Sequence, residues 1–149
     1  MIFELVSANK KHCDLLFQWV NNDLVRKNSF NTKNIEYKDH KNWFVSKILS
    51  KYCHIYILYL KDIAIGQVRI DIKDKKGIID YSIDEKYRGN NYGVVLLNLL
   101  KGKVSREGID INMLLGSVKK QNIASQKVFE KCGYSKVIKD DYINYYYEI

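Results

Sequence analysis

Hydrophobic and polar positions follow two different periods along this chain, and the period separates predicted strands from predicted helices. Between residues 63 and 72 apolar side chains occupy alternate positions, as at Val68 and Ile70, which is typical of a strand with one buried face. From Val94 to Leu100 the apolar side chains instead form a continuous helical pattern. Strands followed by helices and then by more strands predict a mixed α/β sheet.

The same patterns place each predicted element along the chain. The polar segment 21–30 is predicted to link the first two helices, and the long helix ends near Gly108, with a kink or an early end allowed at Gly102. The predicted strands are 3–6, 55–60, 63–72, 78–83, 113–118, 136–139 and 142–149, and the predicted helices are 11–20, 38–49, a long helix that contains 94–100, and 124–131.

The loop between the strand 78–83 and the long helix has the composition of an anion-binding turn. Gly89 and Gly93 allow the backbone to approach a ligand closely, and Asn91 tolerates a left-handed conformation. Successive N–H groups in such a turn form a nest for phosphate oxygens, and Arg88 adds a permanent cation. An ordinary connection between a strand and a helix would use the same residue types, so the loop alone leaves both interpretations open.

A second motif follows the strand 113–118. From Asn122 to Tyr134 the chain reads NIASQKVFEKCGY, similar to N-x-x-S-x-x-x-(Y/F)-E-K-x-G-(F/Y), and Arg88 to Gly93 is similar to R-x-x-G-x-G, with Asn91 where the first glycine is usual. In this order and spacing the two motifs resemble those of the GCN5-related N-acetyltransferase (GNAT) family. The resemblance extends over the whole chain and implies a single α/β domain, 1–149, with a mixed, mainly antiparallel sheet and about four helices.

The resemblance implies that acetyl-CoA is the co-substrate and that no metal is required. The turn would bind the diphosphate, and the strand at 81–83 would separate from its neighbour and pair with the pantetheine arm, with a bulge near Ser82 that directs one N–H at the thioester oxygen. Asn122 would reach the pantetheine amide, or it caps the helix that follows. The implied coenzyme-binding residues are Tyr81, Ser82, Ile83, Arg88, Gly89, Asn90, Asn91, Tyr92, Gly93, Val94, Asn122, Ser125 and Phe129.

Acetyl transfer requires a neutral amine, a stabilised oxyanion and a tolerable leaving thiolate, and we predict two catalytic side chains. Asp80 interrupts an apolar strand, where partial burial would adapt it as a base; otherwise it is a structural carboxylate paired with a lysine. Many GNAT enzymes protonate the sulfur with a tyrosine at the position of Phe129, which has no hydroxyl. Tyr134 is the predicted replacement, and Tyr81, a water molecule or unassisted departure of the thiolate are the alternatives.

The amino-terminal pattern at 17–26 and 40–43 resembles a GNAT subgroup, the nucleotide-sugar amine N-acetyltransferases of bacterial surface-polysaccharide synthesis, including the pseudaminic-acid type. Arg26 and His40 would then hold phosphate, and Trp43 would stack on a base or sugar. We therefore predict a nucleotide-linked amino sugar as the acceptor. The same pattern also fits enzymes that acetylate ribosomal-protein amino termini, and a CoA-binding module with weak or lost catalysis is a third alternative.

Composition and charge restrict the partners without selecting one. The net charge of +8 favours anionic partners, but the lysines are scattered, so nucleic acid is not predicted. No apolar run is long enough for a membrane span, and the amino terminus does not resemble a secretory signal. Cys13, Cys53 and Cys132 lack metal-ligand spacing, which favours reduced thiols in a cytoplasmic protein. Whether the chain forms a homodimer stays open.

Overall fold

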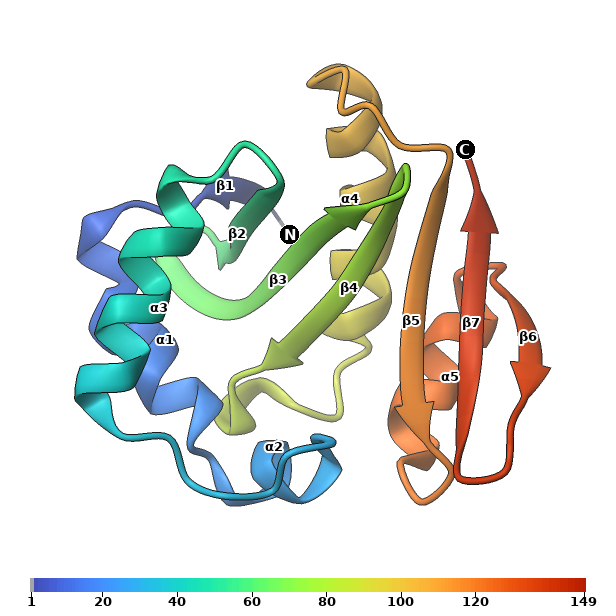
Figure 1. The fold of residues 1–149 in the computed structure, drawn as a ribbon, viewed down its shortest axis with the longest axis horizontal. Helices are drawn as coiled ribbons and strands as arrows, with labels where there is room; N and C mark the ends of the chain where they lie inside the picture. Colours follow the sequence, from blue (N-terminus) through green and yellow to red (C-terminus); the bar gives the residue numbers. More distant parts are fainter. Residues whose placement is uncertain (1) are drawn as a thin grey trace.

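One seven-stranded sheet with helices on both faces forms the protein in the computed structural model, which describes residues 2–149 (Figure 1). The strands are β1 (Phe3–Ser7), β2 (Cys53–Leu60), β3 (Ile63–Lys73), β4 (Lys76–Ile83), β5 (Met113–Lys119), β6 (Ser135–Ile138) and β7 (Tyr142–Glu148). The helices are α1 (Cys13–Val20), α2 (Asp23–Asn28), α3 (Tyr37–Leu49), α4 (Tyr92–Arg106) and α5 (Ile123–Lys131), with short 3-10 turns at Lys10–His12 and Glu85–Tyr87.

The strand order is β1-β2-β3-β4-β5-β7-β6, and every neighbouring pair is antiparallel except β4 and β5. The long helix α4 forms the crossover connection that two parallel strands require. The predicted fold class, a mixed and mainly antiparallel α/β sheet, is therefore confirmed.

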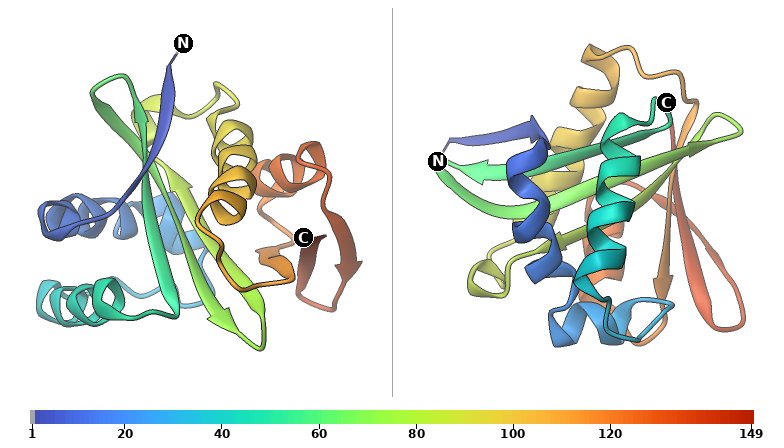
Figure 2. Two further views of the ribbon diagram at one scale, coloured as in Figure 1. Left: turned by 90° about the horizontal axis from the view of Figure 1, so that it is seen from above. Right: turned by 60° about the vertical axis from the view of Figure 1, so that its left-hand side comes forward.

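The sheet separates two hydrophobic cores, with α1, α2 and α3 on one face and α4 and α5 on the other (Figure 2). Successive side chains of β3 point to opposite faces of the sheet. Val68 and Ile70 join the core under α4, whereas Gln67 and Arg69 point to the other face. The smaller core under α1 and α3 is formed by Leu16, Trp19, Phe44, Cys53, Ile55 and Ile57.

The opening between β4 and β5 is the feature of the fold that creates the candidate site. The two strands pair only from Lys76 opposite Met113 to Ile78 opposite Leu115, and beyond that point they diverge (Figure 1). The predicted separation of this strand from its neighbour is confirmed. The predicted bulge near Ser82 is wrong: β4 pairs with β3 in a uniform register, and the irregularity lies instead between β2 and β3.

The helices differ from the sequence prediction at the segment 21–30. The segment predicted as a linker contains α2, whose start is capped by Asn22: its side-chain oxygen accepts hydrogen bonds from the N–H groups of Leu24 and Val25. Helix α4 continues through Gly102 without a break, and Gly108 has the left-handed φ of +60° expected just after a helix. Among residues 2–149, no helix has the length and apolar character that a membrane crossing requires.

Candidate active site

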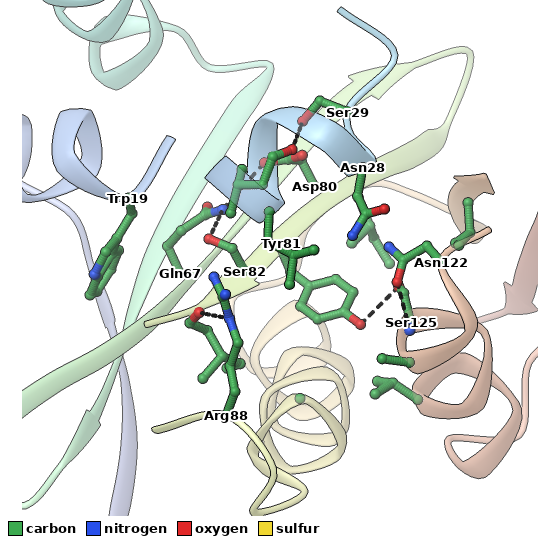
Figure 3. Close-up of a pocket in the computed structure, with 18 of the residues that line it drawn as sticks. Trp19, Asn28, Ser29, Gln67, Asp80, Tyr81, Ser82, Arg88, Asn122 and Ser125 are labelled. Atoms are coloured by element: carbon green, nitrogen blue, oxygen red, sulfur yellow. Dashed lines mark hydrogen bonds between the residues drawn. The ribbon is translucent and has the colours of Figure 1, made fainter. Parts of the chain in front are cut away.

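A cavity of about 540 Å³ occupies the opening between β4 and β5 (Figure 3). Its α4–α5 side is lined by Tyr81, the turn before α4, and α5, with Ser117 and Val118 of β5 at its edge. Its α1–α3 side is lined by helical residues such as Trp43 together with polar side chains of β3 and β4. We use these two names for the sides of the cavity below.

The turn before α4 has the backbone of an anion site. Asn91 adopts a left-handed conformation with φ 61° and precedes the helix, but its side chain caps no N–H group there. The first turn of α4 contains no acidic residue, so the positive end of the helix dipole is not neutralised locally. The Asn90 side chain holds the turn by donating to the carbonyls of Tyr87 and Arg88. This geometry fits the predicted diphosphate nest.

The Arg88 guanidinium is hydrogen-bonded to its own chain. Its Nε donates to the carbonyl of Ile83 at 3.0 Å and its terminal nitrogen donates to Asn22 Oδ1 at 3.2 Å. The guanidinium thus joins β4 to the start of α2, and its predicted phosphate contact stays a prediction. Two cations that the sequence prediction missed line this side instead: Lys127 and Lys131 on α5, of which Lys131 donates to Asn91 Oδ1 at 3.2 Å. Their i,i+4 spacing is a signal that could have identified them.

The free edge of β4 faces the cavity. Backbone groups of successive strand residues point to opposite sides, and the Asp84 N–H donates toward β3, to Ile65. The N–H and C=O groups of Tyr81 and Ile83 therefore face the opening, where Arg88 already occupies the Ile83 carbonyl. A linear ligand with amide groups can pair with this edge as an added strand does.

Tyr81 connects this edge to α5. Its hydroxyl shares a hydrogen bond of 2.9 Å with Ser125 Oγ, and both residues line the cavity (Figure 3). Burial raises the pKa of Tyr81 to about 12, so the hydroxyl keeps its proton at neutral pH. Asn122 accepts the N–H of Ser125 at 3.2 Å and thus caps α5, the second of the two roles considered for it.

The predicted catalytic tyrosine lies outside the cavity. Tyr134 is 6% exposed, does not line the cavity, and its hydroxyl is buried without a hydrogen-bond partner among residues 2–149. Burial raises the pKa of Tyr134 well above its ordinary value. The Phe129 ring lies between this side chain and Tyr81 and stacks on Tyr145. A role for Tyr134 as the acid therefore has no support in the geometry.

Two of the predicted acceptor-binding residues bind their own chain instead. Arg26 is 8% exposed and donates to the carbonyls of Val20, Asn31 and Lys33 and to Ser29 Oγ. His40 is 4% exposed and its Nε2 lies 2.9 Å from the carbonyl oxygen of Cys13. The geometry therefore does not support the predicted phosphate role of either side chain.

Trp43 lines the cavity, so its predicted stacking role remains a prediction. In this structure the Arg69 guanidinium lies over its ring, 5.0 Å from the ring centre. The positive charge of Arg69 thus lies directly against the aromatic ring of Trp43.

Asp80 stands on the α1–α3 side with a set of polar partners. It accepts a hydrogen bond from Gln67 Nε2 at 3.2 Å and lies 3.8 Å from a terminal nitrogen of Arg69, while the same Gln67 amide also contacts Ser82 Oγ. The Asp80 side chain is 55% exposed, so the predicted partial burial is wrong. It nevertheless lines the cavity on β4, one residue before Tyr81. Because neighbouring strand residues point to opposite faces, the carboxylate and the Tyr81 hydroxyl lie on opposite sides of β4.

A family model described as "Acetyltransferase (GNAT) family" matches residues 15–134, which is most of the chain and includes both motifs. The chain belongs to the GNAT family of acetyltransferases. It is accordingly an acetyl-CoA-dependent N-acetyltransferase. No curated protein matches the sequence.

Solved structures share the fold at low sequence identity. The ribosomal L7/L12 alpha-N-protein acetyltransferase RimL, in complex with coenzyme A, has a TM-score of 0.84 at 20% identity, covering 99% of this chain and 94% of its own. A domain from Methanocaldococcus jannaschii has a TM-score of 0.85 at 18% identity, covering 99% of both chains. Spermidine N-acetyltransferase from Vibrio cholerae, in complex with CoA and spermine, has a TM-score of 0.83 at 12% identity, covering 98% of this chain and 95% of its own. At these identities the likeness shows the fold alone.

The α4–α5 side of this GNAT enzyme fits coenzyme A. The left-handed turn at Asn91 and the uncapped start of α4 suit a diphosphate. The free edge at Tyr81 and Ile83 suits the two amides of a pantetheine arm, and Lys127 and Lys131 add positive charge for phosphate. Acetyl-CoA would supply an activated acetyl group there, and these residues would bind and orient it.

Proposed function

We propose that this enzyme acetylates the free amino terminus of a peptide or protein. The observation that carries the proposal is the chemistry of the α1–α3 side of the cavity. Its most exposed charged group is the carboxylate of Asp80, with 55% of the side chain exposed against 25% for the neighbouring Arg69. The Arg26 guanidinium, the predicted phosphate ligand, donates to backbone carbonyls instead. A carboxylate attracts a protonated amino group and repels a phosphate.

The second support is the edge of β5. Beyond Leu115 this strand is no longer paired with β4, and it continues to Lys119 along the cavity. An extended peptide could add to such an edge through main-chain hydrogen bonds while β4 holds the pantetheine arm. A nucleotide sugar has no regular series of amides with which to use that edge. The structural neighbour RimL, whose name describes an alpha-N-protein acetyltransferase, agrees with this choice.

In the proposed reaction, one face of β4 provides the base and the free edge of β4 provides the hydrogen-bond donors. Asp80, directly or through a water molecule, accepts a proton from the incoming ammonium or amine nitrogen. The N–H groups on the free edge at Tyr81 and Ile83 donate to the acetyl oxygen as negative charge develops on it. Gln67 and Arg69 hold the Asp80 carboxylate in place, at 3.2 and 3.8 Å.

A thiol-release assay with matched acceptors tests this proposal. Peptides with free amino termini are compared with the same peptides blocked at the amino terminus, with spermidine, and with UDP-linked amino sugars. The proposal predicts turnover of the free peptides and none of the blocked ones. Efficient turnover confined to UDP-linked amino sugars or to spermidine would overturn it.

A further inference from the structure

Position 129 cannot supply a hydrogen-bond donor to the leaving thiolate of coenzyme A. Phe129 has no hydroxyl, and the end of its ring is directed at Gly116 of β5, where an added Cβ would collide with Phe129 Cζ. A tyrosine in the same orientation would drive its hydroxyl into β5 instead of toward the cavity. A side-chain donor to the sulfur would therefore come from another element.

Tyr81 has the position that the reaction requires. Its backbone lies on the free edge of β4, and its ring passes over the start of α4, with Cε2 3.4 Å from the place where a Cβ on Gly93 would lie. Its hydroxyl ends at Ser125 Oγ, in the first turn of α5 (Figure 3). Backbone and hydroxyl of one residue thus border the space predicted for the end of the pantetheine arm. We propose that Tyr81, positioned by Ser125, donates the hydrogen that stabilises the departing sulfur of coenzyme A.

Three serine hydroxyls that line the cavity have partners away from Tyr81. Ser82 contacts Gln67 on the opposite face of β4, Ser117 donates to Asn144 at 2.6 Å, and Ser29 donates to the carbonyl of Val25 at 2.6 Å. The hydroxyls of Tyr81 and Ser125 instead share one hydrogen bond with each other, in which either oxygen can be the donor. Such a pair can orient the tyrosine hydrogen, because Ser125 can donate to the Tyr81 oxygen while Tyr81 donates outward.

The step balances without any further reactant. The amine nitrogen forms a bond to the acetyl carbon, the carbon–sulfur bond breaks, and its electron pair goes to sulfur. Tyr81 donates a hydrogen bond to the sulfur and keeps its own proton, the amine proton passes to the Asp80 side and from there to water, and coenzyme A leaves as the thiolate. Burial raises the pKa of Tyr81 to about 12 against a smaller lowering by the Ser125 hydrogen bond, so the tyrosine is a donor throughout the pH range of the assay.

Replacement of one hydroxyl tests the catalytic role. We expect Tyr81→Phe to lower kcat by about 10²-fold or more, the usual size for loss of one hydrogen-bond donor to a developing negative charge, and Ser125→Ala to lower it less. Tyr134→Phe is the matched control, because it removes a neighbouring buried hydroxyl that has no partner in the described chain. That variant should retain kcat to within about threefold.

Coenzyme binding provides a readout that does not depend on turnover. Calorimetry compares CoA with desulfo-CoA from pH 7 to 10 in the wild type, Tyr81→Phe and Ser125→Ala. A hydrogen-bond donor at the sulfur favours the thiolate form of CoA over the thiol form. In the wild type, the affinity of CoA relative to desulfo-CoA should therefore increase as the pH rises through the thiol pKa of about 8.5. This increase should disappear in Tyr81→Phe. Ser125→Ala, which keeps the tyrosine, should reduce this gain in CoA affinity. It provides the same test if Tyr81→Phe does not fold.

The outcomes separate this inference from the proposed function on which its coenzyme site rests. An unchanged gain of affinity in Tyr81→Phe, or kcat retained to within about threefold, would overturn the role of Tyr81. Absence of peptide turnover together with a normal thiolate preference would overturn the peptide acceptor alone. Loss of kcat in Tyr81→Phe with an unchanged thiolate preference would indicate a merely structural role and also contradict the inference.

Discussion

The two sides of the cavity use their polar groups in opposite ways. On the α4–α5 side the groups offered to a ligand are largely backbone: the left-handed turn at Asn91, the start of α4 and the free edge of β4. On the α1–α3 side two conspicuous polar side chains, Arg26 and His40, hold their own chain together. A cationic or aromatic side chain in a cavity wall is therefore not by itself a ligand contact. The comparison yields three mutational predictions.

Arg26→Ala should have the largest effect, on stability. The substitution removes a buried guanidinium that bonds three carbonyls and one hydroxyl, so these acceptors lose their partners. We expect the free energy of unfolding in urea to fall by about 3 kcal/mol. Arg106→Ala, at an exposed position in the last turn of α4, is the control and should change it by less than about 0.5 kcal/mol. Unchanged stability with a raised acceptor KM would instead make Arg26 a substrate ligand.

Asp80→Asn should act on catalysis and leave the coenzyme side intact. The asparagine keeps an oxygen for Gln67 but cannot take up a proton, so we expect kcat/KM for the acceptor to fall by about 10²-fold. The dissociation constant of acetyl-CoA, measured by calorimetry, should not change. Asp71→Asn is the matched control, since Asp71 also pairs with Arg69, at 2.8 Å, but does not line the cavity. An equal loss in both variants would assign the effect to Arg69.

Asn91→Val should weaken acetyl-CoA binding by about tenfold, because a β-branched residue is strained by roughly 1–2 kcal/mol in the left-handed conformation that shapes the turn. Asn91→Gly should preserve the affinity, since glycine adopts that conformation freely. Lys61→Val introduces the same strain at φ 55° in the turn between β2 and β3 and controls for general destabilisation. Equal binding by Asn91→Val and Lys61→Val would remove the turn from the coenzyme site.

The same comparison explains how far the sequence could predict the molecule. Strands and long helices follow local periodicity, so the order of elements and the mixed sheet were predictable. The turn at Asn91 was also predictable, because its chemistry depends on backbone conformation that Gly89, Asn91 and Gly93 encode locally. Helix α2 was missed because its six residues are too few to show a helical pattern, and only the cap at Asn22 marks its start.

Side-chain partners distant in sequence could not be read from the pattern. The contact between Tyr81 and Ser125 joins residues 44 positions apart and depends on how α5 packs against β4. The burial of Tyr134 and the direction of the Phe129 ring depend on packing against β5 and β7, which the motif alone does not encode. Arg26 and His40 were predicted as ligands from residue type. The Arg26 bond to the Asn31 carbonyl depends on the segment after α2, and the His40 contact with the Cys13 carbonyl depends on how α3 packs against α1.

A crystal structure of the protein with acetyl-CoA tests the central claim most directly. We predict that the diphosphate lies against the N–H groups that follow Asn91 and that the pantetheine arm pairs with β4 at Tyr81 and Ile83. The thioester should then lie between the Tyr81 hydroxyl and the Asp80 side of the strand. Coenzyme bound elsewhere, with the opening between β4 and β5 left empty, would contradict the account.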